Sequence, residues 1–120
     1  MVHGRIIYDE LLKLNKNVVF YVFSCIQNYL KIYKVGNLVF SNKVASDITD
    51  ILLTSTYFSQ ALADLCLSFP NINSSKTYLK KVLHGFIGYV LAKNPTLFHL
   101  KYIRSVPTRN SGYTIYHKIS

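Results

Sequence analysis

The residue types that bind metals are few in this chain of 120 residues and show none of the usual spacing. Zinc sites need cysteine or histidine ligands in close pairs. No two cysteines lie near each other, and no two histidines share a metal-binding spacing. The residues concerned are Cys25, Cys66, His3, His84, His99 and His117. We therefore expect no metal and no cofactor, and we expect both cysteines to be small buried hydrophobic residues.

The carboxylates that acid–base catalysis or magnesium binding would use all lie in the first 64 residues. They are Asp9, Glu10, Asp47, Asp50 and Asp64. No glycine motif that cradles phosphate is present, since Gly85 and Gly88 fall inside a helical pattern. The sequence therefore predicts a protein that is not an enzyme, and it indicates no small-molecule substrate.

Positive charge is concentrated in the part of the chain that lacks acidic residues. The first 64 residues carry six basic and five acidic side chains, whereas residues 65–120 carry eight basic side chains and no acidic one. The eight are Lys76, Lys80, Lys81, Lys93, Lys101, Arg104, Arg109 and Lys118. Such a segment cannot neutralise itself through internal ion pairs, so we expect an anionic partner, with nucleic acid first. The alternative is that the charge only keeps the protein soluble.

The composition indicates a folded domain that is not secreted. Half of the residues are hydrophobic and 14% are aromatic, which excludes a disordered chain. The longest apolar run, at about residues 18–23, is far shorter than the roughly 20 residues of a membrane-spanning helix. No signal-peptide pattern marks the N-terminus. We expect a cytoplasmic protein without membrane association, and the bias toward tyrosine, lysine, asparagine and isoleucine fits a small viral or mobile-element regulator in the host cell.

Two helices are predicted in the first 40 residues. Residues 5–14 place Ile6, Ile7, Leu11 and Leu14 on one helical face. Residues 18–34 are apolar except for one narrow polar stripe, although the β-branched residues at 18–22 leave a strand start open. A helix with so wide an apolar face packs either in the core or against a second copy of the chain. We therefore expect a homodimer whose interface includes residues 18–33.

The centre of the chain predicts a short strand and two helices. A turn at Gly36-Asn37 precedes a short strand at residues 38–40. The helix that follows is capped by Ser41 or Asn42. Its apolar face comprises Val44, Ile48, Ile51 and Leu52. A second helix has apolar residues from 57 to 66 at helical spacing and ends before Pro70.

A longer helix is predicted from a cap at Ser74 or Ser75 to about residue 92. Its expected buried face comprises Leu79, Val82, Leu83, Phe86 and Val90. Its expected outer stripe comprises Lys76, Thr77, Lys80, Lys81, His84 and Gly88. Gly85 and Gly88 each weaken a helix by about 1 kcal/mol relative to alanine. They permit either the close approach of another backbone or a bend.

A β-hairpin is predicted at the C-terminal end. Residues 97–105 and 113–119 are rich in aromatic and β-branched residues, and turn formers lie between them. Arg109 lies in the turn, and three further cations, Lys101, Arg104 and Lys118, lie on the strands. His99 and His117 could face each other across the hairpin as a surface pair.

The order of two helices, a turn, a longer helix and a hairpin over residues 41–120 resembles the winged helix-turn-helix superfamily. The residues behind the resemblance are Ala61, Leu62 and Leu65 in the second helix, Ile72 in the turn, Ser74, Ser75 and Lys76 at the start of the third helix, and Leu79, Val82 and Leu83 beneath it. The resemblance implies a mainly α fold whose C-terminal hairpin is the wing. Residues 1–40 would be an N-terminal helical extension and a candidate dimerisation element within one compact unit.

The predicted function is binding of double-stranded DNA, as a transcriptional regulator or an architectural protein. The third helix would enter the major groove, and the basic hairpin would contact the backbone or the minor groove. Lysines act mainly as point charges on phosphate, so the sequence supports affinity more than specificity. The alternatives are a protein-interaction module that reuses the fold, and RNA binding, with Tyr78, Tyr102 and Tyr116 stacking on single-stranded bases. The predicted contact residues are Ser75, Lys76, Thr77, Lys80, Lys81, His84, Lys101, Arg104, Arg109 and Lys118.

Overall fold

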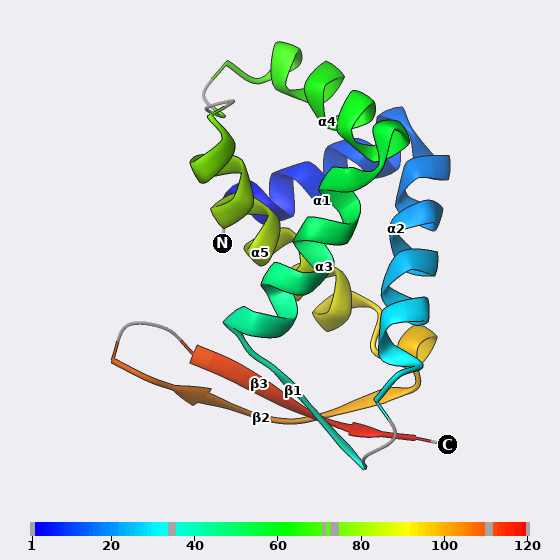
Figure 1. Cartoon of the computed structure of the whole chain (residues 1–120), viewed down its shortest axis with the longest axis vertical. Helices are drawn as coiled ribbons and strands as arrows, with labels where there is room; N and C mark the ends of the chain where they lie inside the picture. Colours follow the sequence, from blue (N-terminus) through cyan, green and yellow to red (C-terminus); the bar gives the residue numbers. More distant parts are fainter. Residues whose placement is uncertain (1, 34–35, 71, 73–74, 110–111, 120) are drawn as a thin grey trace.

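The computed structural model describes residues 2–33, 36–70, 72, 75–109 and 112–119. These residues form α1 (Val2–Leu14), α2 (Lys16–Leu30), β1 (Asn37–Phe40), α3 (Asn42–Thr54), α4 (Thr56–Ser68), α5 (Lys76–Lys93), the short 3-10 helix η1 (Thr96–Phe98), β2 (Leu100–Pro107) and β3 (Gly112–Lys118). The α-helices lie on one side of a small antiparallel sheet (Figure 1). The predicted fold class, mainly α with a C-terminal β-hairpin, is confirmed.

Side-chain caps set several of the helix starts. Asn15 accepts a hydrogen bond from the backbone N–H of Val18 at the start of α2, and Ser55 accepts one from Phe58 at the start of α4. Ser75 accepts one from the N–H of Tyr78, so the predicted cap of α5 is confirmed; the alternative cap, Ser74, lies outside the described residues. Ser41 occupies the N-cap position of α3, but its side chain makes no capping bond.

Helix α2 ends at Leu30, earlier than the predicted residue 34. Its last turn tightens, because the N–H groups of Ile32 and Tyr33 bond to carbonyls three residues back. The ammonium of Lys118, far along the chain, caps this end of the helix by donating to the carbonyls of Leu30 and Tyr33. The helix end is therefore set by a tertiary contact that the local sequence does not show.

The three strands form one antiparallel sheet in the order β1-β3-β2. The strand predicted at residues 38–40 is confirmed, and it pairs with β3, with Leu38 opposite Tyr116. The sheet therefore begins before residue 41, the predicted start of the winged unit. This arrangement of helices followed by a hairpin that joins an earlier strand is consistent with a winged-helix-like topology.

The base of the hairpin differs from the prediction. Strand β2 begins at Leu100 and not at residue 97, because Thr96–Phe98 form a 3-10 turn and His99 adopts a left-handed conformation with φ of 54°. The predicted pairing of His99 with His117 is wrong, since His117 lies opposite Lys101 and the His99 carbonyl accepts from the N–H of Ile119. The register also shifts between Tyr102 and Arg104, which leaves Ile103 as a bulge.

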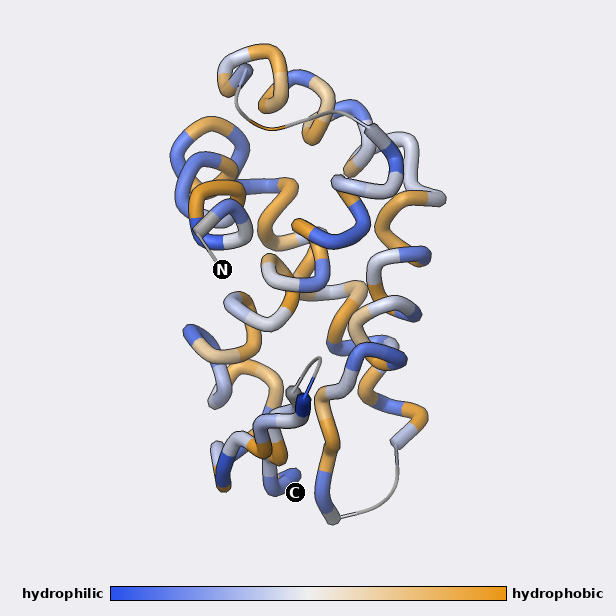
Figure 2. Tube along the Cα trace, turned by 90° about the vertical axis from the view of Figure 1, so that its left-hand side faces the viewer, coloured by the Kyte–Doolittle hydropathy of each residue, from blue (hydrophilic) through white to orange (hydrophobic). Residues whose placement is uncertain are grey.

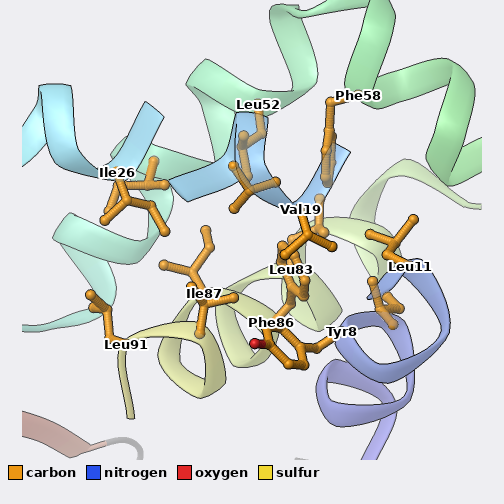
Figure 3. Close-up of a cluster of buried hydrophobic side chains, with 14 of the residues drawn as sticks. Tyr8, Leu11, Val19, Ile26, Leu52, Phe58, Leu83, Phe86, Ile87 and Leu91 are labelled. Atoms are coloured by element: carbon orange, nitrogen blue, oxygen red, sulfur yellow. The ribbon is translucent and has the colours of Figure 1, made fainter. Parts of the chain in front are cut away.

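One hydrophobic core holds the helices and the sheet together. It includes buried residues from both the 1–40 segment and the remainder of the chain, so the two segments pack as one unit. Figure 3 shows side chains of α1, α2, α3, α4 and α5 converging in its centre, among them Tyr8, Val19, Phe58 and Phe86. Much of the wide apolar face of α2 is buried in this core, with Val18, Val22 and Ile26 fully enclosed. The homodimer, which that face suggested, stays a prediction.

Helix α5 is buried on more than the one predicted face. Val82, Leu83, Phe86 and Val90 are buried as expected, but Leu79 is only half-buried. Ile87 and Leu91 are also fully buried. The reason is that α1 and α3 both pack against α5, so its apolar surface meets neighbours over a wider arc than a surface helix does.

The crossing of α1 and α5 depends on glycine. A β-carbon built at Gly4 would lie 2.6 Å from the carbonyl carbon of Gly85 and 2.6 Å from the nitrogen of Phe86. The two backbones are thus nearly in contact, which confirms the predicted close approach at Gly85. Gly88 has a different neighbour, since a β-carbon there would lie 3.3 Å from the ring of Phe40.

Thr49 on α3 gives a stability prediction. Its side chain is fully buried, and its hydroxyl has no hydrogen-bond partner among the described residues. Because an unpaired buried hydroxyl costs free energy and valine has nearly the same shape, Thr49→Val should stabilise the fold by about 1 kcal/mol, or roughly 4 °C in Tm. Thr54→Val is the matched control. The hydroxyl of Thr54 already donates to the Ile51 carbonyl at 2.7 Å, so its removal should not stabilise the fold. Thermal unfolding in which Thr49→Val melts no higher than the parent would contradict the prediction.

Candidate nucleic-acid interface

A groove of about 1070 Å³ runs between α5, the start of α3 and the hairpin. We call it the α5 groove. From α5 it is lined by Thr77, Lys80, Lys81, His84, Gly85 and Gly88. From β1 and α3 it is lined by Phe40, Ser41, Asn42, Ala45 and Ser46, and from the hairpin by Ser105, Val106, Pro107, Gly112, Tyr113 and Thr114. In Figure 1 the end of β2 and the start of β3 lie at the left, below the first turns of α5, and Figure 2 is viewed from that side.

The lysine stripe of α5 forms the cationic wall of this groove. Lys76, Thr77, Lys80 and Lys81 are exposed, because the opposite side of the helix is held in the core by Val82, Leu83 and Phe86. Thr77, Lys80 and Lys81 line the groove itself, and no carboxylate is among its described lining residues. The groove surface is therefore largely apolar but edged by two lysines with no carboxylate among its described lining residues, which favours an anion beside it. The hydroxyl of Ser75 caps the same helix.

His84 occupies the floor of the groove, between α5 and α3. It is half-buried, and its Nε2 lies 3.1 Å from the hydroxyl oxygen of Ser46. Burial lowers the pKa of the imidazole below its ordinary value, and the nearby Asp50 opposes that effect only in part. The ring is therefore mainly neutral near pH 7, and it contributes a hydrogen-bonding group to the groove and not a cation.

The lowered pKa of His84 gives a pH-dependent stability. The folded ring takes up a proton less readily than the unfolded one, whose pKa is near 6.5. Stability from this residue is therefore fully present above about pH 6.5 and is lost as the pH falls toward the lower folded pKa. We expect His84→Gln, which stays neutral, to lose less stability than the parent between about pH 7.5 and pH 5.5. Urea unfolding at both pH values measures this, and equal losses in the two proteins would contradict it.

The cations of the hairpin are divided between different sides of the molecule. Arg109 is exposed in the turn, next to the groove wall formed by Pro107 and Gly112. Lys101 lies opposite His117 and Arg104 opposite Ile115. Since Leu100 and Tyr116 are buried toward the helices, alternation along the strands places these pairs on the outer face of the sheet. Lys101 and Arg104 thus face away from the α5 groove.

Lys118 is not brought to the groove. It is half-buried at the end of β3, where its ammonium donates to the carbonyl of Leu30 at 3.1 Å and to that of Tyr33. Two of its three donors are therefore used to hold the end of α2 against the hairpin. The structure gives this residue an anchoring contact in place of the predicted exposed position.

The tyrosines suggested as a stacking surface for single strands are not gathered on one surface. Tyr116 is 3% exposed, and the hydroxyl of Tyr78 is hydrogen-bonded to His3 on α1. Tyr102 is exposed, but its ring packs edge-on against Tyr116 at 6.3 Å between centroids. A sheet that binds bases needs several accessible ring faces, and only Tyr102 among these three offers one.

The groove also contains polar residues that the sequence did not single out as contacts. Ser41, Asn42 and Ser46 lie at the start of α3, and Ser105 and Thr114 lie on the hairpin with their hydroxyl oxygens 3.3 Å apart. The local sequence indicates Ser41 and Asn42 only as helix caps. Their proximity to α5 depends on the pairing of β1 with β3, which local sequence does not reveal.

Among the described residues, no group of three or more histidine, cysteine, aspartate or glutamate side chains is close enough to hold a metal ion. No helix in the described part of the chain has the length and apolar character needed to cross a bilayer.

Comparison of the chain with protein-family models, with curated proteins and with solved structures found no match.

Proposed function

We propose that this chain is a DNA-binding protein of the winged helix-turn-helix type, serving as a transcriptional regulator or an architectural binder. One observation carries the proposal. Lys80 and Lys81 of α5 line the same groove as the hairpin strands, and Arg109 lies between those strands. No carboxylate is among the described residues that line the groove. A helix with a cationic, donor-bearing face beside a projecting hairpin is an arrangement suited to the curved, anionic surface of a duplex.

In the proposed complex, the first half of α5 contacts DNA in or beside the major groove. Lys76, Thr77, Lys80 and Lys81 are the exposed side chains available there. Arg109 extends the contact through the hairpin turn, where a planar guanidinium suits a phosphate or a narrow minor groove. Lys118 is not part of the proposed DNA interface, because its ammonium is bonded to the end of α2. Lys101 and Arg104 would contact only DNA that curves around the outer face of the sheet.

The chemistry of this surface favours affinity over sequence discrimination. The planar donor groups of arginine, asparagine and glutamine suit bidentate recognition of bases best, whereas the exposed face of α5 offers lysine and threonine. Lysine contacts phosphate as a point charge. We therefore propose a modest ratio of specific to non-specific binding, together with a steep dependence on salt.

A homodimer would raise affinity by placing two α5 helices on successive turns of one duplex. Phe20 on α2 is 51% exposed and Ile32, just after the helix, is 69% exposed, so both remain available for a second copy. A dimer with a binding free energy of about −8 kcal/mol dissociates only near 1 µM. Light scattering at tens of micromolar should therefore give the mass of a dimer, and the mass of a monomer would contradict this part of the proposal.

The experiment that tests the function compares three nucleic acids of one sequence: duplex DNA, duplex RNA and single-stranded DNA. Gel shifts are run at about 50 mM and about 200 mM salt. We expect the tightest binding to duplex DNA, with affinity falling steeply at the higher salt. Tighter binding to RNA or to the single strand would replace the proposal with another nucleic-acid function. No binding to any of the three would leave the protein-interaction alternative.

A further inference from the structure

A second cavity, of about 480 Å³, lies at the base of the hairpin and is separate from the α5 groove. Its walls come from the end of α2, from η1 and from the end of β3. We call it the hairpin-base pocket. Its volume falls within the range of roughly 300–1,000 Å³ that is common for small-molecule sites. No residue of the predicted DNA-contacting surface on α5 belongs to it.

The floor of the hairpin-base pocket is apolar. Leu30 and Phe98 are almost fully buried, and both line the cavity together with the half-exposed Ile119. The side-chain amide of Gln27 is held in place by a hydrogen bond to the carbonyl of Leu97 at 3.3 Å. A floor of this kind accepts a hydrocarbon or an aromatic ring, because burying apolar surface is favourable at about 25 cal/mol per Å².

The rest of the lining is basic. Lys31, His99 and Lys118 line the pocket, and no acidic side chain is among its described lining residues. Lys118 has one donor left after its bonds to the carbonyls of Leu30 and Tyr33. Lys31 is exposed and makes no ion pair among the described residues. An apolar floor beside two ammonium groups that make no ion pair among the described residues is complementary to a molecule with a hydrocarbon body and one anionic end.

The backbone at this position is also unusual. His99 is the single non-glycine residue with positive φ among the described residues, at 54°. Left-handed backbone of this kind is uncommon for a side chain with a β-carbon, and such outliers cluster at ligand sites. It is fixed here by the bond from the N–H of Ile119 to the His99 carbonyl at 2.7 Å, which joins the two ends of the hairpin beside the pocket.

We propose that the hairpin-base pocket binds a small amphipathic carboxylate, with its hydrocarbon body on Leu30, Phe98 and Ile119 and its carboxylate at Lys31 and Lys118. This inference does not depend on DNA binding, because the ligand is detected directly. The bound molecule would bridge α2 and both ends of the hairpin, and it would stabilise the folded state by an amount that rises with the logarithm of its concentration once that exceeds the Kd.

The test uses octanoate as the probe and the full chain, with amide NMR spectra as the readout. We expect saturable shifts of the amides around Leu30, Phe98 and Ile119. Butyrate, with the same charge and a shorter body, should bind at least tenfold more weakly, as about 0.8 kcal/mol per buried methylene implies. Octanol has the same eight-carbon chain but no carboxylate, and it should also bind more weakly than octanoate.

The matched variants are Lys31→Gln and Lys16→Gln. Both lysines are exposed on or next to α2, and only Lys31 lines the pocket. Lys31→Gln should weaken octanoate binding about two- to fivefold, as expected for loss of an exposed ion pair, and Lys16→Gln should not. Absence of saturable shifts, octanol binding as tightly as octanoate, or equal effects of the two substitutions would each overturn the proposal.

Discussion

Replacing Gly4 with alanine is expected to destabilise the protein by about 2 kcal/mol, within the range for overpacking a tight core. The new β-carbon would lie 2.6 Å from two backbone atoms at Gly85 and Phe86, and 3.1 Å from the Gly85 carbonyl oxygen. Backbone atoms inside a helix cannot rotate aside as a flexible side chain can. Helices α1 and α5 must therefore separate, which loosens the packing of Ile7 and Phe86 in the core.

The direction of this effect is informative because alanine ordinarily stabilises a helix relative to glycine, by about 1 kcal/mol. Gly36→Ala is the matched control, since a β-carbon there meets nothing within 4 Å and no described glycine has positive φ. It should leave stability within about 0.5 kcal/mol of the parent. Urea unfolding measures both. A Gly4→Ala protein as stable as the parent would show that the two helices do not cross as closely as described.

The largest expected effect on function follows from removing two charges at the α5 groove. The double variant Lys80→Ala with Lys81→Ala should weaken duplex DNA binding about tenfold or more near 0.1 M salt. Each lost phosphate contact should also reduce the slope of log affinity against log salt by about 0.9. The folded state should survive, because both side chains are exposed and alanine is a strong helix former.

A control with the same loss of net charge separates local contact from general attraction. Lys13→Ala with Lys16→Ala removes two exposed lysines at the junction of α1 and α2, which lies on the opposite side of the molecule from the end of β2 (Figure 1). This variant should change affinity much less than the α5 variant. Equal losses from the two double variants would mean that only net charge matters, and unchanged binding by the α5 variant would remove this surface from the proposed interface.

Several features of the fold could be predicted from sequence because they depend on local pattern. Ser75 caps α5 through a bond to the backbone N–H three residues on, and a serine before an apolar repeat signals such a start. The exposed stripe of Lys76, Lys80 and Lys81 followed from helical spacing alone. The absence of acidic residues after Asp64 is likewise a property of the amino-acid sequence, and by itself it predicts an anionic partner.

Other features were decided only by tertiary structure. The pairing of β1 with β3 joins residues more than seventy positions apart, and it brings Ser41 and Asn42 to the α5 groove. The contact of Lys118 with the end of α2 removes a predicted DNA contact and helps form the hairpin-base pocket. Pairing between distant segments depends on how the apolar faces of helices and strands pack together and on the register of the strands. A short stretch of sequence determines neither. The sequence by itself thus determined which residues are basic and which helical faces are apolar, whereas the packing of distant segments determined which basic residues share a surface.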